Sequence, residues 1–442
     1  MTTTRNLILG AGLAGLSAAL HLPQGETLVV EREREPGGLC RTRRVEGFFF
    51  DCTGHLLHLG KGPVREMVLG LLPRAFRSVE RRSCVFSKGV FTGYPFQANT
   101  HGLPPEVVRE CVVGFVESLM RKGREEEPDN FRDWVLATFG EGIARHFMFP
   151  YNEKLSCVNL REVECGWVSW SIPRPTLDEV IQGALGTEVR GLGYNARFLY
   201  PGKGGISCIP EALAGRCGTI RTGCSVRSVD FRKRRALLEG GESVEYERLI
   251  STLPLDALLR ILKPLPEGIS RQASGRLRAV RVVNVNLGVD RSGVLPCHWA
   301  YFPEPEFPFY RVGSPTNYSD HVAPEGCSSL YVEVARLRNE PVDEEALQEE
   351  ILEGLRRARI LRRSDRILAR EAVVLEPAYV IHDHFRRGAL PGILKRLEEQ
   401  KIFSIGRFGA WEYGSMESAL RQGRETALRL APAGRRVAGG KA

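Results

Sequence analysis

The chain has 442 residues, of which 43% are hydrophobic and 26% are charged, and its formal net charge is +9. This length is too great for one ordinary core and predicts two or three lobes, while the residue balance is typical of a soluble globular enzyme. No run approaches the roughly 18 apolar residues of a membrane-spanning helix, and the positive charge favours an anionic ligand or surface.

The N-terminal residues lead directly into a predicted strand, so we expect no signal peptide. The 11 cysteines are scattered, odd in number and without CxxC spacing. This favours reduced thiols in the cytoplasm over a disulfide framework and gives no support for a metal site. The dense basic run Arg232–Arg235 falls between two strand-like segments, so we expect an exposed hairpin tip. Because no aromatic residues alternate with it, we expect no nucleic-acid partner.

The first predicted elements form a nucleotide-binding pattern. A buried strand at Leu7–Leu9 is followed by Gly10, Gly12 and Gly15 and then by a helix. The first glycine permits a tight turn, the second lets a pyrophosphate approach the backbone, and the third allows the helix to pack on the strand. A second strand ends at Glu31, whose carboxylate can accept hydrogen bonds from a ribose. Together these features predict a dinucleotide-binding unit.

A second glycine turn, with Gly37 and Gly38 and then Arg41 and Thr42, comes shortly after that acid. A nicotinamide dehydrogenase has no need of it, whereas FAD is long enough to require contacts beyond the first pyrophosphate site. Here the sequence resembles flavoproteins with two dinucleotide-binding domains, which include amine oxidases, protoporphyrinogen oxidases, phytoene desaturases and UDP-galactopyranose mutases. The resemblance implies an α/β fold with a Rossmann-like domain that binds FAD noncovalently.

The C-terminal segment 404–423 has a related pattern: a short strand, a glycine-flanked arginine, two aromatic residues and a helix. In the flavoproteins that the chain resembles, this segment returns to the FAD domain and closes over the flavin. The resemblance therefore implies one cofactor held from both ends of the chain. The residues assigned to FAD are Gly10, Gly12, Leu13, Ala14, Gly15, Glu31, Arg32, Gly37, Gly38, Leu39, Arg41, Val226, Gly406, Arg407, Tyr413, Ser415 and Met416.

Three stretches are expected to form the FAD-binding domain, and two insertions are expected to form substrate regions. The FAD stretches are 1–75, 205–275 and 372–442, the mainly helical insertion is 76–204, and the β-rich insertion is 276–371. In the helical insertion, apolar spacing predicts helices over 103–123 and 129–155, and Asp129 or Asn130 is the expected N-cap of the second. In the β-rich insertion, the pattern predicts strands over 279–289 and 328–337 and an acidic helix over 343–360.

Longer segments are similar to UDP-galactopyranose mutases, especially the eukaryotic type, over nearly the whole chain. The most specific are "PFYR", with the "NYS" that follows it, and the closing "GRFGAWEY". The resemblance implies an isomerase that interconverts pyranose and furanose sugars, with reduced FAD as the nucleophile at the anomeric carbon and NADH or NADPH as a candidate reductant. A flavin oxidase or desaturase is the alternative, and a FAD-binding regulatory protein is the third possibility.

The same resemblance assigns a catalytic or substrate role to specific side chains. Arg311 and the tyrosines would hold the diphosphate, because guanidinium and phenol groups donate hydrogen bonds to phosphate oxygens. His55 would lie beside the flavin. The expected catalytic residues are His55, Arg174, Arg311 and Tyr413, and the expected substrate contacts are Tyr94, Gln97, Asn195, Tyr301 and Tyr379. The plain alternatives are that a tyrosine belongs to the core and that Arg174 forms a surface ion pair.

Three departures from the mutase pattern leave the substrate open. Ser156 stands where the mutases usually have a tryptophan, and Ser171 stands where they have an arginine, for which Arg174 is a possible substitute. The segment after "GRFGAWEY" lacks the usual acidic or Asn-Gln-Asp-His element. We therefore expect a nucleotide sugar as substrate, with neither its sugar nor its base fixed.

Overall fold

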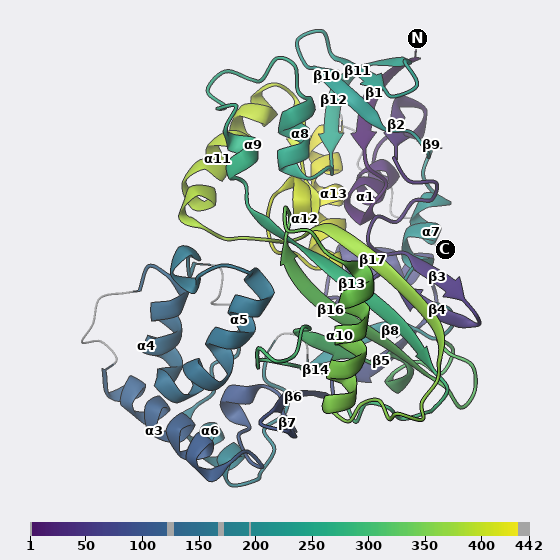
Figure 1. Cartoon of the computed structure of the whole chain (residues 1–442). Helices are drawn as coiled ribbons and strands as arrows, with labels where there is room; N and C mark the ends of the chain where they lie inside the picture. The colour runs from purple at the N-terminus through teal and green to yellow at the C-terminus, as the bar shows by residue number, and fades with distance from the viewer. Residues whose placement is uncertain (1, 122–127, 167–171, 194–195, 432–442) are drawn as a thin grey trace.

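In this computed structural model, residues 2–121, 128–166, 172–193 and 196–431 are described, and they form two large sheets and a group of helices (Figure 1). The first sheet has the strand order β10-β11-β12-β1-β2-β9, with β18 added beside β12. Its strands are β1 (Thr2–Leu9), β2 (Thr27–Val30), β9 (Thr219–Arg221), β10 (Val226–Asp230), β11 (Arg235–Leu238), β12 (Ser243–Ser251) and β18 (Ile402–Ser404). The α/β class predicted from the sequence is confirmed.

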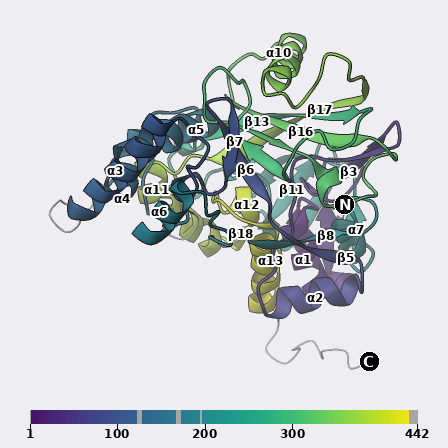
Figure 2. The same ribbon diagram turned by 90° about the horizontal axis from the view of Figure 1, so that it is seen from below.

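The core of the first sheet is parallel, because β1 pairs in parallel with both β2 and β12. Helix α1 (Leu13–His21) starts directly after β1, as the glycine spacing predicts, and helix α13 (Met416–Leu430) packs against it. The Ser17 hydroxyl donates to the carbonyl of Leu420 at 2.6 Å. The two ends of the chain are thus joined on one face of this sheet, where α2 (Pro63–Leu71) and α7 (Cys208–Ala214) also lie (Figure 2).

The second sheet has the order β17-β13-β16-β15-β14-β6-β7. Its strands are β6 (Ser83–Ser87), β7 (Val90–Gly93), β13 (Ala279–Val289), β14 (Trp299–Tyr301), β15 (Arg311–Gly313), β16 (Ser328–Leu337) and β17 (Ile367–Val380). The strands predicted over 279–289 and 328–337 are confirmed. Residues 372–380, which begin the expected FAD-binding stretch 372–442, lie in this second sheet, because β17 is one long strand paired with β13 along its length.

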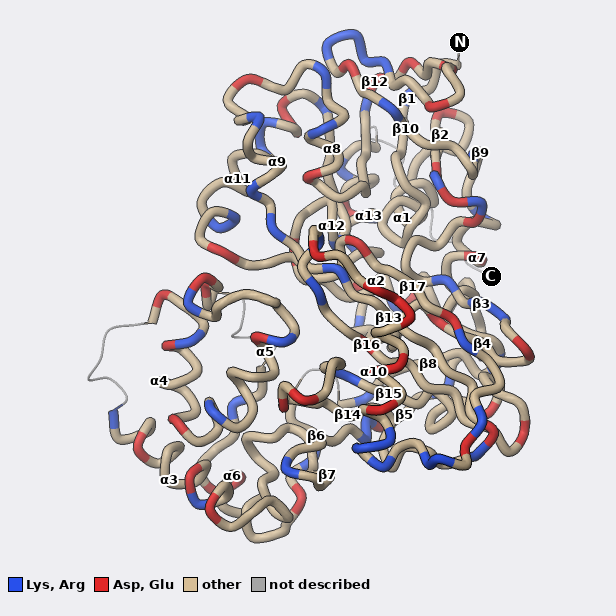
Figure 3. The backbone as a smooth tube through the Cα atoms, in the orientation of Figure 1, with Lys and Arg blue, Asp and Glu red and all other residues tan. Residues whose placement is uncertain are grey.

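Helix α10 (Glu344–Arg357) covers the outer face of the second sheet with Leu347, Ile351 and Leu355, and the predicted acidic helix is confirmed. Figure 3 colours the acidic residues along this helix red, and Figure 2 shows the helix at the edge of the molecule. Outside the helical insert, the other strands are β3 (Thr42–Val45) paired with β4 (Phe48–Asp51) and β5 (Phe76–Glu80) paired with β8 (Arg197–Pro201). The other α-helices there are α8 (Leu255–Ile261), α9 (Ala273–Arg276), α11 (His384–Glu399) and α12 (Gly406–Gly409).

The helical insert consists of α3 (Pro105–Arg121), α4 (Phe131–Ile143), α5 (Phe149–Ser156) and α6 (Leu177–Ala184). The Asn130 side chain caps α4 by accepting from the N–H of Asp133, as predicted. The helix predicted to run on through 155 is interrupted at Gly140, which has φ +73°. A Cβ there would lie 1.9 Å from the carbonyl oxygen of Gly114, so the close crossing of α3 and α4 explains the interruption.

The basic run lies at the outer end of a hairpin (Figure 3), but the hairpin partner is β11, a strand that the sequence did not predict between β10 and β12. No helix of the described residues is long and apolar enough to cross a membrane. Within the same residues, no group of histidine, cysteine and acidic side chains is arranged to hold a metal ion.

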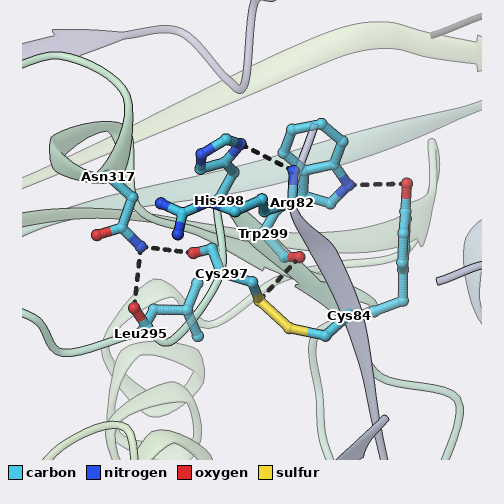
Figure 4. Close-up of a disulfide and its surroundings, with 8 residues drawn as sticks. Arg82, Cys84, Leu295, Cys297, His298, Trp299 and Asn317 are labelled. Carbon is cyan, nitrogen blue, oxygen red and sulfur yellow. Dashed lines mark hydrogen bonds between the residues drawn. A yellow bond between two sulfur atoms is a disulfide. The ribbon is translucent and has the colours of Figure 1, made fainter. Parts of the chain in front are cut away.

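The expectation of reduced thiols is wrong for one pair of cysteines. Cys84 on β6 and Cys297 just before β14 form a disulfide across 213 residues of sequence (Figure 4). The two strands are parallel neighbours, with Cys84 opposite Ala300, and the local sequence around either cysteine carries no sign of this pairing. The argument from thiols for a cytoplasmic location therefore loses part of its support.

Candidate active site

A cavity of about 1140 Å³ lies between the first sheet, the second sheet and the helical insert. Sixteen of the seventeen residues predicted to bind FAD line it: Gly10, Gly12, Leu13, Ala14, Glu31, Arg32, Gly37, Gly38, Leu39, Arg41, Val226, Gly406, Arg407, Tyr413, Ser415 and Met416. The substrate and catalytic candidates that line it are His55, Tyr94, Gln97, Tyr301, Arg311, Tyr379 and Tyr413. One cavity thus collects residues from both ends and the middle of the chain.

The first glycine turn is built for close backbone approach. Gly10 has φ +97°, and a Cβ on it would lie 2.3 Å from the hydroxyl of Thr252. Gly15 does not line the cavity, because it packs behind the turn, where a Cβ would lie 2.0 Å from the carbonyl oxygen of Gly10. Gly12 faces Gly38 of the second glycine turn, with 3.8 Å between its ideal Cβ position and the Gly38 Cα. The two turns therefore form one cradle at the N-terminus of α1.

The Glu31 carboxylate follows β2 and is buried beside this cradle. Its two oxygens accept from the backbone N–H groups of Ala11, at 2.6 Å, and Glu33, at 2.9 Å. Each oxygen keeps a further lone pair, so the carboxylate can still accept from a ligand hydroxyl. Arg41 braces the second turn by donating to the Gly38 carbonyl at 2.9 Å. Arg32 is largely exposed and pairs with Glu33.

The C-terminal segment closes one side of the cavity through Arg407. Its guanidinium donates to the carbonyls of Gly414, at 2.8 Å, and Ala378, at 3.0 Å, and lies 4.8 Å from the ring centre of Tyr413 and 5.1 Å from that of Tyr379. Gly406, with φ +81°, brings this turn against the side chain of Ala14. Arg407 therefore ties the closing segment to β17 and orders the two tyrosine rings.

Beyond the cradle the cavity is rich in phenol groups. The rings of Tyr94 and Tyr301 lie 4.9 Å apart, and Tyr379 and Tyr413 stack at 6.2 Å. The indole N–H of Trp299 donates to the Tyr301 hydroxyl at 2.8 Å. Burial raises the pKa of Tyr94, Tyr301 and Tyr379, so these phenols stay protonated and can donate hydrogen bonds at neutral pH.

Arg311 lies opposite Glu333 on the neighbouring strand β16, and the two form a bidentate ion pair. The guanidinium Nε and Nη2 each lie 2.7 Å from a Glu333 oxygen. The Glu333 side chain is only 1% exposed, whereas that of Arg311 is 21% exposed. Arg311 is thus held rigidly with one edge on Glu333, and Glu333 is a cavity-lining residue that the sequence did not indicate.

His55 lies in the loop after β4, and its partly buried imidazole lines the cavity. Burial lowers its pKa from 6.5 to about 4, so the ring is neutral at physiological pH. Its Nδ1 is buried with no hydrogen-bond partner in the described part of the chain. A buried polar atom without a partner is rare in native proteins and is typical of a site that a ligand completes.

The other predicted residues have different surroundings. Gln97 donates to the carbonyl of Pro173 at 2.7 Å, which fixes its amide. Arg174 is outside the cavity lining, and its guanidinium lies 5.2 Å from the ring centre of Trp134. Asn195 and Ser171 fall outside the described residues. Ser156 lines the cavity, but its hydroxyl donates to the Asn152 carbonyl at 2.7 Å.

Further lining residues were missed because nothing in their local sequence marks them. The helical insert contributes Phe131, Phe147, Met148, Tyr151, Leu155, Leu160 and Val163, and the second sheet contributes Trp299, Tyr331 and Glu333. Their apolar spacing in the sequence is that of ordinary core helices and strands. The far end of the cavity is therefore more apolar than the residues matched to the mutases suggested.

Comparison with known proteins agrees with this geometry. Residues 13–431 match the family model of flavin-containing amine oxidoreductases, and the chain belongs to this family. A crystal structure of reduced UDP-galactopyranose mutase is similar with a TM-score of 0.91 and 29% identity, covering 98% of this chain and 95% of that one. The resemblance drawn from the sequence is confirmed.

Oxidoreductases are also similar to the chain. The zeta-carotene-forming phytoene desaturase of Myxococcus xanthus is 25% identical over 386 residues, which are 74% of this chain and 71% of the desaturase. Putrescine oxidase bound to putrescine is similar in fold, with a TM-score of 0.62 and 17% identity over 97% of this chain and 99% of that one. The protein is thus a FAD-dependent enzyme of the amine oxidase superfamily.

The described residues fit FAD. The paired glycine turns leave open backbone where a side chain would block a pyrophosphate, and Glu31 lies at the end of β2, where a ribose hydroxyl would be bound. The unpartnered Nδ1 of His55 and the tyrosines ordered by Arg407 lie farther along the same cavity.

Proposed function

We propose that the protein is a flavin-dependent sugar-nucleotide mutase that interconverts pyranose and furanose forms of its substrate and holds FAD noncovalently. The observation that carries this proposal is the set of hydrogen-bond donors beyond the cradle, where Arg311 is fixed among the phenols of Tyr301, Tyr379 and Tyr413. A diphosphate accepts from such donors. The similarity to the mutase structure at a TM-score of 0.91 supports the same assignment.

Reduced FAD, when bound, supplies a nucleophile for a reaction at the anomeric carbon that involves no net redox change. The protein's own residues then have three tasks. Arg311, held in place by Glu333, stabilises the negative charge of the departing diphosphate. Tyr301 and Tyr379, whose raised pKa values keep them protonated, donate to its oxygens. The apolar side chains of the helical insert exclude water that would otherwise hydrolyse an activated sugar.

A flavin oxidase or desaturase is the second candidate. It is favoured by the apolar end of the cavity, formed by Phe131, Phe147, Met148, Leu160 and Val163, and by the similarity to the desaturase. Such an enzyme would start from oxidised flavin and consume one acceptor in each turnover. If the protein is a mutase, NADH or NADPH is the candidate reductant of its flavin.

The test is to incubate the protein, reduced with dithionite, with UDP-galactose and other nucleotide sugars and to separate the isomers by chromatography. We expect many turnovers for each reduction and flavin that is still reduced at the end. Oxidised protein is the control and should be inactive. Turnover by oxidised protein with stoichiometric consumption of oxygen would instead establish the oxidase.

A further inference from the structure

The ring of Tyr331 on β16 occupies a slot formed by two glycines. A Cβ on Gly54 would lie 2.4 Å from the Tyr331 hydroxyl oxygen, and a Cβ on Gly313 would lie 2.1 Å from the ring carbon Cζ. Neither glycine has a positive φ, so the backbone conformation does not require glycine at either position. The space that a side chain would need is filled by the tyrosine ring, and this accounts for both glycines.

The register of the second sheet places Tyr331 beside Arg311. Gly313 lies directly opposite Tyr331, and Arg311 lies directly opposite Glu333, across strands β15 and β16. Residues two apart on a strand share a face, so the tyrosine and the ion pair face the same side of the sheet. That side lines the cavity, and the Arg311 guanidinium carbon lies 5.9 Å from the centre of the Tyr331 ring.

The Tyr331 hydroxyl can donate a hydrogen bond to a ligand. The residue is 3% exposed and lines the cavity, and its hydroxyl bonds to no other group of the residues that the structure describes. By contrast, the Tyr301 hydroxyl already accepts from the Trp299 indole. Burial raises the pKa of Tyr331, so its phenol remains a donor throughout the neutral range.

We propose that Tyr331 is a substrate-contacting residue whose hydroxyl donates a hydrogen bond to an oxygen of the sugar in the bound nucleotide sugar; this inference rests on the proposed function. The hydroxyl lies against Gly54, next to His55, whose Nδ1 is also without a partner. In the tautomer of His55 with the proton on Nε2, Nδ1 is an acceptor. A sugar hydroxyl can donate to Nδ1 while it accepts from Tyr331, whereas a phosphate oxygen has no proton to donate to Nδ1. In this arrangement Arg311 and the other tyrosines bind the diphosphate.

The test compares Tyr331→Phe, which keeps the ring in its slot and removes only the hydroxyl, with Tyr318→Phe as a matched control. Tyr318 is also buried, at 8% exposure, but lies outside the cavity lining. The affinities of FAD-loaded proteins for UDP-galactose and for UDP are measured by titration calorimetry. Loss of one neutral hydrogen bond corresponds to about 3- to 10-fold in affinity.

We expect Tyr331→Phe to lower the affinity for UDP-galactose by that factor and to leave the affinity for UDP, the FAD content and the melting temperature unchanged. Tyr318→Phe should resemble the wild type in all four. A second variant, Gly313→Ala, places a methyl group where the ring lies, so it should lower the affinity for UDP-galactose and also the melting temperature.

Three other outcomes would overturn the inference, and they differ in what they say of the proposed function. An equal loss of UDP and UDP-galactose affinity would place the hydroxyl on the diphosphate. Wild-type affinity of Tyr331→Phe for both ligands would remove Tyr331 from the site while leaving the nucleotide-sugar proposal intact. If the wild-type protein binds neither ligand, the nucleotide-sugar proposal itself fails, and the ligand assigned to Tyr331 fails with it.

Discussion

At the scale of single residues, Arg311 and Glu333 act as one unit. Replacing Arg311 by alanine removes a charged donor from the cavity and also leaves a carboxylate that is 1% exposed without its partner. We expect nucleotide affinity to fall by about 10- to 100-fold and the free energy of unfolding to fall by about 3–5 kcal/mol. Calorimetric titration with UDP and urea unfolding measure the two effects separately.

The double variant Arg311→Met/Glu333→Leu is the control for that experiment. It removes both charges at similar volume, so most of the stability should return while the affinity stays low. Wild-type nucleotide affinity in Arg311→Ala would show that the guanidinium does not contact the ligand.

His55 gives the protein a predictable dependence on pH. Its pKa is about 4 in the fold, against 6.5 for an unperturbed histidine, so the folded protein binds fewer protons there than the unfolded chain. His55 thus contributes stability that is present above about pH 6.5 and is lost as the pH falls toward its folded pKa. Between about pH 7 and pH 5 this loss should amount to about 2 kcal/mol.

Urea unfolding at these two pH values checks the expectation. His298 and His382 also have pKa values lowered by burial and add to the loss in the wild type, so His55→Gln should reduce the loss by about 2 kcal/mol and not abolish it. Replacing the exposed His101 by glutamine should leave the loss unchanged. Equal pH dependence in the wild type and His55→Gln would contradict the lowered pKa of His55.

At the scale of elements, the contact between α1 and α13 joins the two ends of the chain beside the cofactor cradle. A Cβ on Gly423 of α13 would lie 2.2 Å from the carbonyl oxygen of Ala14 and 2.9 Å from the N–H nitrogen of Ala18. Gly423→Ala should therefore push the helices apart, lower the free energy of unfolding by about 1–3 kcal/mol and release flavin.

Gly392→Ala in α11 is the matched control, since a Cβ there meets nothing within 4 Å. A glycine-to-alanine change inside a helix should then stabilise the protein by about 0.5–1 kcal/mol. Urea unfolding and the flavin content after gel filtration provide the comparison. Retention of flavin and stability by Gly423→Ala would mean that α13 does not close the cofactor site.

At the scale of the whole molecule, one disulfide joins two strands of the second sheet that come from distant parts of the chain. The sequence contains 11 cysteines, and nine of them are free when Cys84 and Cys297 are bonded. Thiol titration of the denatured protein without reductant should therefore find nine thiols and, after reduction, eleven. Cys297→Ser should give ten in both cases, and eleven thiols before reduction would show that the bond does not form.

The sequence by itself determined the features whose parts are close in the chain. Local backbone geometry specifies the turn with Gly10 and Gly12 and the position of Glu31 after the next strand. Local apolar spacing specifies strand β13 and, separately, helix α10. The family resemblance extended this to the closing segment at the C-terminus. Local sequence is sufficient there because each element is specified by residues within a few turns or strand positions.

Only the tertiary structure decided which distant side chains meet. The Arg311–Glu333 pair, the slot that Gly54 and Gly313 provide for Tyr331, and the disulfide across 213 residues all depend on the order and register of strands in the second sheet. A shift of one residue in any of these strands would turn every one of its side chains to the opposite face. That register is fixed by packing over the whole sheet, and no single segment of the sequence contains it.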